Sequence, residues 1–219
     1  MLNELDKELT RRGLPFVRYA DDSMIFCKSK RAAKRVKESI TRFIEGKLHL
    51  KVNRDKTVVS YVQGVKYLGY SFYVMKGKCQ LTVHPKAKAK MKAKLKELTS
   101  RSNGWGYAKR KQKLEEYIKG WVGYYHLANM KRFLIETDEW LRRRLRMCIC
   151  KSWKRVKTRV ANLLKCGIDK YQAYMWGNSR LGYWRIAGSY ILSRAITNEK
   201  LSMAGYATLM GSYIEWHPK

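Results

Sequence analysis

Two adjacent carboxylates, Asp21 and Asp22, are the side chains of this sequence best placed to do chemistry. They lie between two short runs rich in apolar and β-branched residues, within 16–27, which predicts two antiparallel strands and a tight turn at 20–22. A turn escapes the strict alternation of side chains along a strand, so both carboxylates can point outward. Mg²⁺ prefers such oxygen ligands and is often held by one or two carboxylates plus substrate phosphates. The pair therefore indicates phosphoryl transfer, with a plain Asp-Asp turn as the alternative.

The composition favours a polyanionic partner. The chain of 219 residues carries 48 Lys and Arg against 17 Asp and Glu, a net charge of +31, which makes nucleic acid the first candidate. An anionic membrane surface is the competing partner, but no apolar run approaches the roughly 18 residues of a spanning helix, so we expect no membrane. Five scattered cysteines and four histidines show no zinc-ligand spacing, which is typical of a cytoplasmic protein with free thiols.

The spacing of apolar residues predicts a mixed α and β region up to residue 84. A short amphipathic helix is expected at 1–12, and a longer helix is expected after a cap at Ser29. Short strands are then predicted at 48–52, 57–62, 65–74 and 79–83, with a turn at Lys76-Gly77. The pattern changes at His84-Pro85, where we place a domain boundary.

The second region is predicted to be helical and much more basic. Three amphipathic helices are expected at 86–98, from the loop 102–106 to about 128, and at about 131–153, and together they would form a small bundle. Shorter helical segments are expected at 156–164, 170–175, 180–195, 199–201 and 206–214. The sequence therefore predicts three parts, at 1–84, 85–155 and 156–219.

Several motifs resemble those of a known family. FVRYADDSMI (16–25) resembles the palm hairpin of reverse transcriptases, in the form found in group II intron-encoded proteins. LHLKVNRDKT (48–57) resembles the next palm motif, and KYLGYSF (66–72) resembles the primer-grip hairpin. GWVGYY (120–125) and WLRRRL (140–145) resemble parts of the maturase, or X, region that forms the thumb. The resemblance implies an α+β fold: a partial palm of antiparallel hairpins plus a helix, an all-α thumb bundle, and a C-terminal extension of the maturase region.

The resemblance also implies roles for single residues in RNA-directed DNA synthesis with a primer-template. Asp21 would ligate the catalytic Mg²⁺ ions and Asp22 would assist, while Tyr19 and Ala20 would lie near the primer end and the incoming nucleotide. Lys56 would approach the triphosphate, where it could neutralise charge or donate a proton to pyrophosphate. A solvated turn lysine is the alternative for Lys56.

The same resemblance assigns primer and RNA contacts elsewhere. Leu68, Gly69 and Tyr70 would contact the primer, with packing in a core strand as the alternative. Structured RNA, a group II intron, would meet outward basic side chains at Lys88, Lys90, Lys92, Lys94, Arg110, Lys111, Arg142, Arg143 and Arg146. For the lysines of 86–96, a merely solvated charged helix is the alternative. Aromatic residues could stack on unpaired bases or pack in the core, and the candidates are Trp105, Tyr107, Trp176 and Trp184.

One part of the expected metal site is missing from this sequence. In the family a third carboxylate lies on a strand well before the Tyr-Ala-Asp-Asp turn, whereas only fifteen residues precede Phe16 here and their spacing is helical. We therefore expect a weak or incomplete Mg²⁺ site and no appreciable primer extension by the chain alone, although a separately encoded N-terminal half could complement it. Two alternatives stay open: a non-catalytic RNA-binding maturase module that assists intron splicing, and a decayed remnant.

Overall fold

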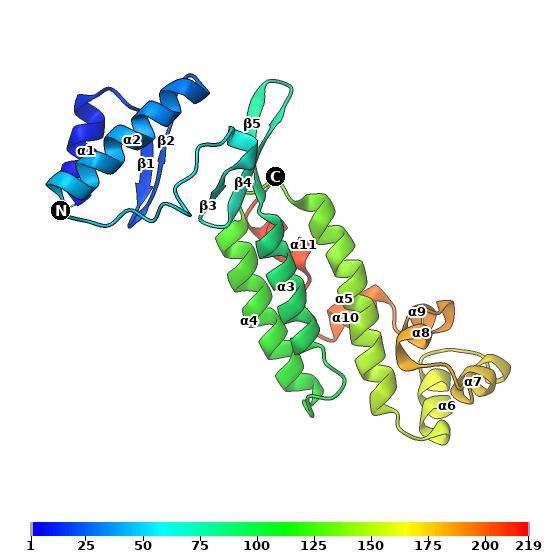
Figure 1. Cartoon of the computed structure of the whole chain (residues 1–219). Coiled ribbons are helices and arrows are strands. Elements are labelled where there is room, and N and C mark those ends of the chain that lie inside the picture. Colours follow the sequence, from blue (N-terminus) through cyan, green and yellow to red (C-terminus); the bar gives the residue numbers. More distant parts are fainter. Residues whose placement is uncertain (1, 219) are drawn as a thin grey trace. The chain divides into compact units, whose positions relative to one another are not determined.

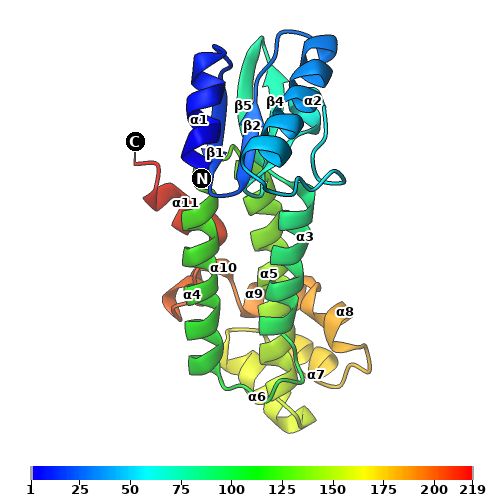
Figure 2. The same cartoon turned by 60° about the vertical axis from the view of Figure 1, so that its left-hand side comes forward.

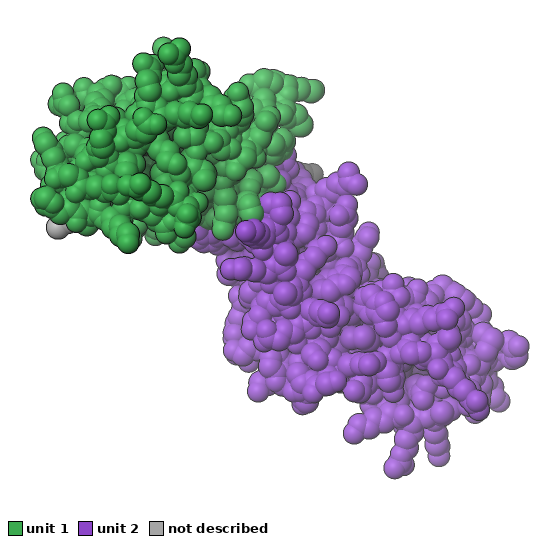
Figure 3. Space-filling model, viewed as in Figure 1, with its two compact units in different colours: residues 1–84 green, residues 85–219 purple. Residues whose placement is uncertain are grey.

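The computed structural model describes residues 2–218 and confirms the α+β fold class. The chain divides into two compact units, Met1–His84 and Pro85–Lys219 (Figure 3), and each is described by itself. Within the described residues, no helix is both long enough and apolar enough to cross a membrane.

The first unit combines two helices with two small antiparallel sheets (Figure 1). One sheet is a two-stranded hairpin, and the other has three strands in the order β3-β4-β5. The elements are α1 (Leu2–Arg11), β1 (Phe16–Tyr19), β2 (Asp22–Ile25), α2 (Lys30–Lys47), the 3₁₀ helix η1 (Val62–Gly64), β3 (Lys66–Tyr67), β4 (Tyr70–Met75) and β5 (Lys78–Val83).

A small core holds both helices against the β1–β2 hairpin. Leu5 and Leu9 of α1 are buried together with Ile40 of α2, and Phe16 and Ile25, which are paired across the hairpin, pack against them. The predicted cap of α2 is present, because the Ser29 side chain accepts the Ala32 N–H at 3.2 Å. The two helices therefore support the strands that carry the acidic pair.

Two of the predicted strands are wrong, and a third is divided into two strands by a turn. Residues 48–61 contain no strand, although β-branched residues are frequent there. The Asn53 side chain accepts the Lys56 N–H at 3.1 Å and closes a turn, and Val58 is 71% exposed with no neighbouring strand to cover it. The predicted strand 65–74 is interrupted because Leu68 (φ +49°) and Gly69 (φ +82°) both adopt left-handed backbone conformations, which form a tight hairpin turn between β3 and β4.

The second unit is entirely helical within its described residues. Three long helices, α3 (Pro85–Leu98), α4 (Tyr107–Tyr125) and α5 (Lys131–Ser152), run alongside one another (Figure 2). Shorter helices follow as α6 (Val156–Lys165), α7 (Lys170–Gly177), α8 (Tyr183–Ala187), α9 (Tyr190–Ala195), α10 (Asn198–Met203) and α11 (Leu209–Glu215). The single helix predicted at 180–195 is wrong, because Ser189 leaves the helical conformation and its hydroxyl caps α9 by accepting the Leu192 N–H.

Charged side chains of α5 hold the ends of other helices. Arg144, which is 9% exposed, donates from Nε to Thr99 Oγ1 (2.6 Å) and from Nη2 to the carbonyls of Lys96 and Thr99 (both 3.0 Å), at the end of α3. Asp138 accepts the Leu209 and Met210 N–H groups at 2.8 and 2.9 Å, at the start of α11. Burial raises the pKa of Asp138, and the two backbone donors oppose that rise. These contacts satisfy helix-end groups that would otherwise lack partners.

Gly177→Ala is expected to destabilise the second unit by about 1–3 kcal/mol, because it overpacks the contact between α6 and α7. A Cβ at Gly177 would lie 2.5 Å from Val160 Cγ2 and 3.4 Å from the Val160 backbone nitrogen. Urea unfolding followed by tryptophan fluorescence measures the loss. The control is Gly120→Ala in α4, where a Cβ meets nothing within 4 Å, so its stability should be unchanged or raised. Equal unfolding midpoints for the two variants would contradict the packing argument.

Candidate active-site hairpin and basic helix surfaces

The acidic pair lies at the tip of the β1–β2 hairpin. Tyr19 pairs with Asp22 across the strands, so Ala20 and Asp21 alone form the turn, and Ala20 has a left-handed φ of +49°. Both carboxylate side chains are exposed, as is Tyr19, at 66%. The predicted hairpin is therefore present, with Asp21 in the turn and Asp22 as the first residue of β2. Two adjacent carboxylates are presented to solvent, where a cation and a phosphate can reach them.

Arg18 fixes the conformation of this turn from below. Its Nε and Nη2 donate to the two carboxylate oxygens of Asp6 on α1, the first at 2.7 Å, and its Nη1 donates to the Ala20 carbonyl at 3.0 Å. The hydrogen bond to Arg18 holds the pKa of Asp6 below its usual range. The Asp6 carboxylate is thus paired with the Arg18 guanidinium, and Arg18 links the hairpin tip to α1.

Sequence reasoning did not identify the Arg18–Asp6 pair, although a signal for it was present. Strand residues two apart face the same side, so Arg18 lies on the face that Phe16 turns toward the core. A guanidinium on that face needs an acceptor, and α1 supplies one through Asp6.

The motif that resembles the primer grip lies against the β1–β2 hairpin through Tyr67. The Tyr67 hydroxyl donates to the Asp22 carbonyl at 3.4 Å, and burial, with a smaller contribution from the Asp22 charge, raises the pKa of Tyr67. The predicted primer-contacting residues follow directly: Leu68 and Gly69 form the β3–β4 turn, and Tyr70 begins β4. The alternative of core strand packing is therefore wrong for Leu68 and Gly69, which are turn residues.

The described residues supply two candidate metal ligands at the hairpin rather than three. No group of three or more His, Cys, Asp or Glu side chains in residues 2–218 could hold a metal ion. Lys56 is exposed in the turn after Asn53, and no hydrogen bond or ion pair joins its amino group to another described residue. The structure thus leaves Lys56 available to solvent and does not bring it to the acidic pair.

The lysine-rich helix α3 packs one side on α5 and exposes the other. Met91 and Leu95 are buried, while Lys90, Lys92 and Lys94 are exposed. The amino groups of Lys88 and Lys92 lie over the Phe133 ring, 5.0 and 5.5 Å from its centre. Burial lowers the pKa of Lys88, and Lys94 forms an ion pair with Glu97 at 2.7 Å.

Two family models match the chain, one in each unit. Reverse transcriptase (RNA-dependent DNA polymerase) matches residues 1–72, and the group II intron, maturase-specific domain matches residues 88–167. The two matches, in this order along the chain, support a group II intron reverse transcriptase/maturase. A curated relative, the group II intron-encoded protein LtrA of Lactococcus lactis subsp. cremoris, is 37% identical over 67 residues. The same match is found for LtrA of strain MG1363. This 67-residue match covers 30% of this chain and 11% of the length of either relative.

In α4, the prediction that Arg110 points outward is wrong. Arg110 is only 6% exposed, and its Nη2 donates to Asn103 Oδ1 at 3.2 Å. The reason is helical spacing: Arg110, Leu114 and Ile118 are four residues apart and share the buried face of α4. The sequence carried this signal, but the basic character of the residue was given more weight than its position.

Three other predicted RNA contacts of the maturase region are engaged inside the protein. The Lys111 amino group donates to the Ala204 carbonyl at 2.8 Å, after α10. Arg146 Nε donates to the Ile196 carbonyl at 2.8 Å, after α9, and burial lowers the pKa of Arg146. Arg143 donates to the Trp184 carbonyl at 3.0 Å and lies over the Trp184 ring, 4.1 Å from its centre. Cations stabilise helix C-terminal carbonyls, so Lys111 and Arg146 hold the ends of α10 and α9, while Arg143 holds α8 near its start.

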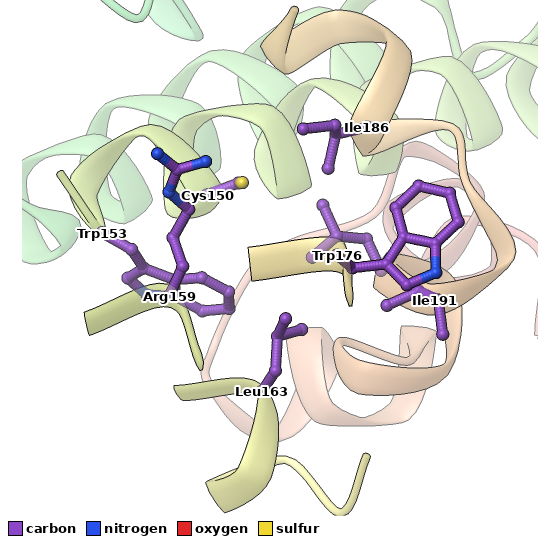
Figure 4. Close-up of a pocket in the computed structure, with 8 residues that line it drawn as sticks. Cys150, Trp153, Arg159, Leu163, Trp176, Ile186 and Ile191 are labelled. Atoms are coloured by element: carbon purple, nitrogen blue, oxygen red, sulfur yellow. The ribbon is translucent and has the colours of Figure 1, made fainter. Parts of the chain in front are cut away.

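Two of the aromatic residues considered for base stacking are also engaged in the maturase unit. Trp184 is covered on one face by Arg143. Trp176 turns into a small, mostly apolar pocket between α5, α6, α7, α8 and α9 (Figure 4). The pocket is lined by Cys150, Trp153, Arg159, Leu163, Trp176, Ile186, Ile191 and Leu192. Both tryptophans therefore contribute first to packing.

Proposed function

We propose that this chain provides the catalytic hairpin and an RNA-binding helical unit of a group II intron-type RNA-directed DNA polymerase/maturase. The observation that supports this most directly is the pair of exposed carboxylates on a hairpin held by Arg18. Residues 1–84 would form part of the palm, 85–155 the thumb, and 156–219 an extension of the maturase region. Its partners would be intron RNA and a primer-template, and a separately encoded N-terminal half is a further candidate partner.

The donor set at the hairpin fits part of a Mg²⁺ site. Asp21 and Asp22 offer adjacent, solvent-facing oxygen ligands, which Mg²⁺ accepts together with substrate phosphates. When bound, the metal would favour ionisation of a primer 3′-hydroxyl and neutralise charge on the leaving pyrophosphate. Because Arg18 holds the Ala20 carbonyl, the two carboxylates stay oriented without substrate.

The remaining residues would position substrate around this pair. Tyr19 and Ala20 would lie near the primer end and the incoming nucleotide, and Lys56 would neutralise charge on the triphosphate. The turn at Leu68 and Gly69, with Tyr70, would contact the primer. Their support is the Tyr67–Asp22 hydrogen bond, which brings this turn into the neighbourhood of the hairpin.

A non-catalytic maturase module that assists splicing is the second candidate function. It is favoured by one observation: the described residues supply two hairpin carboxylates and no third metal ligand near them. This function needs only the basic helical surface. Its best-supported predicted contacts are Lys88, Lys90, Lys92, Lys94 and Arg142. Only the polymerase function requires the Asp21 carboxylate, whereas both functions require the lysines of α3.

Replacing Lys88, Lys90 and Lys92 together by Ala should flatten the salt dependence of RNA binding. Each phosphate contact contributes roughly 0.7–0.9 to the slope of log K against log salt, so the slope should fall by about 2. Fluorescence anisotropy with a folded group II intron transcript, across several salt concentrations, measures it.

A matched control is Lys113→Ala with Lys119→Ala. Both lysines already pair with glutamates of α4, at 2.8 and 2.7 Å, so their loss should change the slope less. An unchanged slope in the α3 variant would remove this helix from the RNA interface.

A further inference from the structure

The outward side of α7 carries aromatic residues where a surface helix is normally polar. Its inward residues Ala173 and Gly177 are buried, and Trp176 turns into the pocket of Figure 4. Tyr171 and Tyr174 are 77% and 52% exposed, and their spacing of three residues places them on the same side of the helix. An exposed aromatic side of this kind usually marks a binding surface.

A third tyrosine lies next to this helix. Tyr190 of α9 meets the Trp176 ring edge-to-face at 5.9 Å, yet 54% of Tyr190 remains exposed. Neither Tyr171 nor Tyr174 forms a ring contact with another described residue. We call Tyr171 and Tyr174 the outer tyrosine face, and Tyr190 lies beside α7 against Trp176.

The charge around this face is strongly positive and has almost no internal compensation. Residues 154–195 contain nine Lys and Arg and one acidic residue, Asp169. The Asp169 carboxylate accepts the Gln172 N–H at 3.0 Å and caps α7. None of the ion pairs among the described residues involves these nine cations. The segment therefore offers unneutralised positive charge together with exposed rings.

We propose that the outer tyrosine face stacks on unpaired bases of single-stranded RNA, while the surrounding Lys and Arg neutralise its phosphates. Every base has a π-face, and aromatic side chains interleaved with cations are the usual platform for unpaired strands. The face begins at Tyr171, four residues after the maturase-specific match ends, so it would extend the RNA interface beyond the matched domain. The proposal rests on the proposed function only in that the chain binds RNA.

The test compares Tyr171→Ala with Tyr174→Ala, made together in the full chain, against the wild-type chain. The probes are a 12-nucleotide oligo-U RNA, an RNA duplex of 12 base pairs, and oligo-dT of the same length. Oligo-U affinity should fall at least about tenfold, because each stacked base contributes on that order, while duplex affinity should stay within about twofold. Tyr171→Phe with Tyr174→Phe keeps both rings and should retain oligo-U affinity. Tyr61→Ala, which removes an equally exposed phenol (74%) from the first unit, is the second control.

Several results would overturn the proposal. They are unchanged oligo-U affinity in the double Ala variant, an equal loss on the duplex, or a loss confined to oligo-dT. A loss confined to phosphatidylserine vesicles, or a change only in sedimentation behaviour, would assign the face to a membrane or to a second copy of the chain. The α3 lysine experiment is independent, so failure of the tyrosine test alone leaves the proposed function standing. Failure of both would leave neither α3 nor α7 in the RNA interface.

Discussion

Asp21→Ala should abolish DNA synthesis, by at least about a thousandfold, because a lost metal ligand removes several kcal/mol of transition-state stabilisation. The measurement is Mg²⁺-dependent primer extension by this chain together with a polypeptide that carries the upstream palm strand and fingers. The chain by itself should give no appreciable extension. RNA affinity, measured in parallel, should be largely unchanged, because Asp21 belongs to the first unit whereas the lysines proposed to bind RNA belong to α3 of the second.

Asp55→Ala is the matched control for this experiment. Asp55 is an exposed carboxylate of the same unit, but it lies in the turn at 54–56 instead of at the hairpin. Its loss should leave synthesis within about twofold, since surface changes away from a site have small effects. Full activity of the Asp21 variant would remove the hairpin from the chemistry, and strong synthesis by the unaided chain would show that no further carboxylate is needed.

Arg144→Ala should lower the unfolding free energy of the second unit by about 3 kcal/mol or more. The guanidinium makes two buried hydrogen bonds to Thr99 and a partly buried one to the Lys96 carbonyl, and each hydrogen bond to a charged group contributes about 1.5–3 kcal/mol. All seven tryptophans lie after residue 84, so their fluorescence in a urea titration reports on this unit alone.

The neighbouring Arg142→Ala provides the control for Arg144→Ala. Arg142 is only partly buried and makes no hydrogen bond to another described residue, so its loss should change stability by less than about 1 kcal/mol. Coincident unfolding curves for the two variants would show that the end of α3 does not depend on Arg144.

The parts of this fold that sequence could predict are those set by local spacing. The α5 helix and the β1–β2 hairpin were predicted almost to the residue, because apolar periodicity and a two-residue turn are readable within a short window. The same reasoning failed at 48–62, where two strands were predicted and none is present. A run of β-branched residues forms a strand only where another strand offers a free edge. The positive φ of Leu68 could not be predicted either, because leucine rarely adopts a left-handed backbone conformation.

In the predicted site, too, local features could be predicted from the sequence and long-range contacts could not. Placing Asp21 and Asp22 at the tip of a hairpin needed only the neighbouring residues, and the structure has Asp21 in the turn and Asp22 directly after it, at the start of β2. The internal roles of Arg143 and Arg146 could not be predicted, because their acceptors lie 41 and 50 residues away along the chain. Arg110 differs from both, since its burial follows from its spacing with Leu114.

The contacts of α5 bear on the order in which the second unit can form. Arg144 holds the end of α3, which is synthesised before α5, while Asp138 holds the start of α11, which is synthesised after it. A nascent chain that has just completed α5 would therefore carry a carboxylate whose partners do not yet exist. This unit should therefore complete its packing only once α11 has been synthesised, and not helix by helix as each one leaves the ribosome.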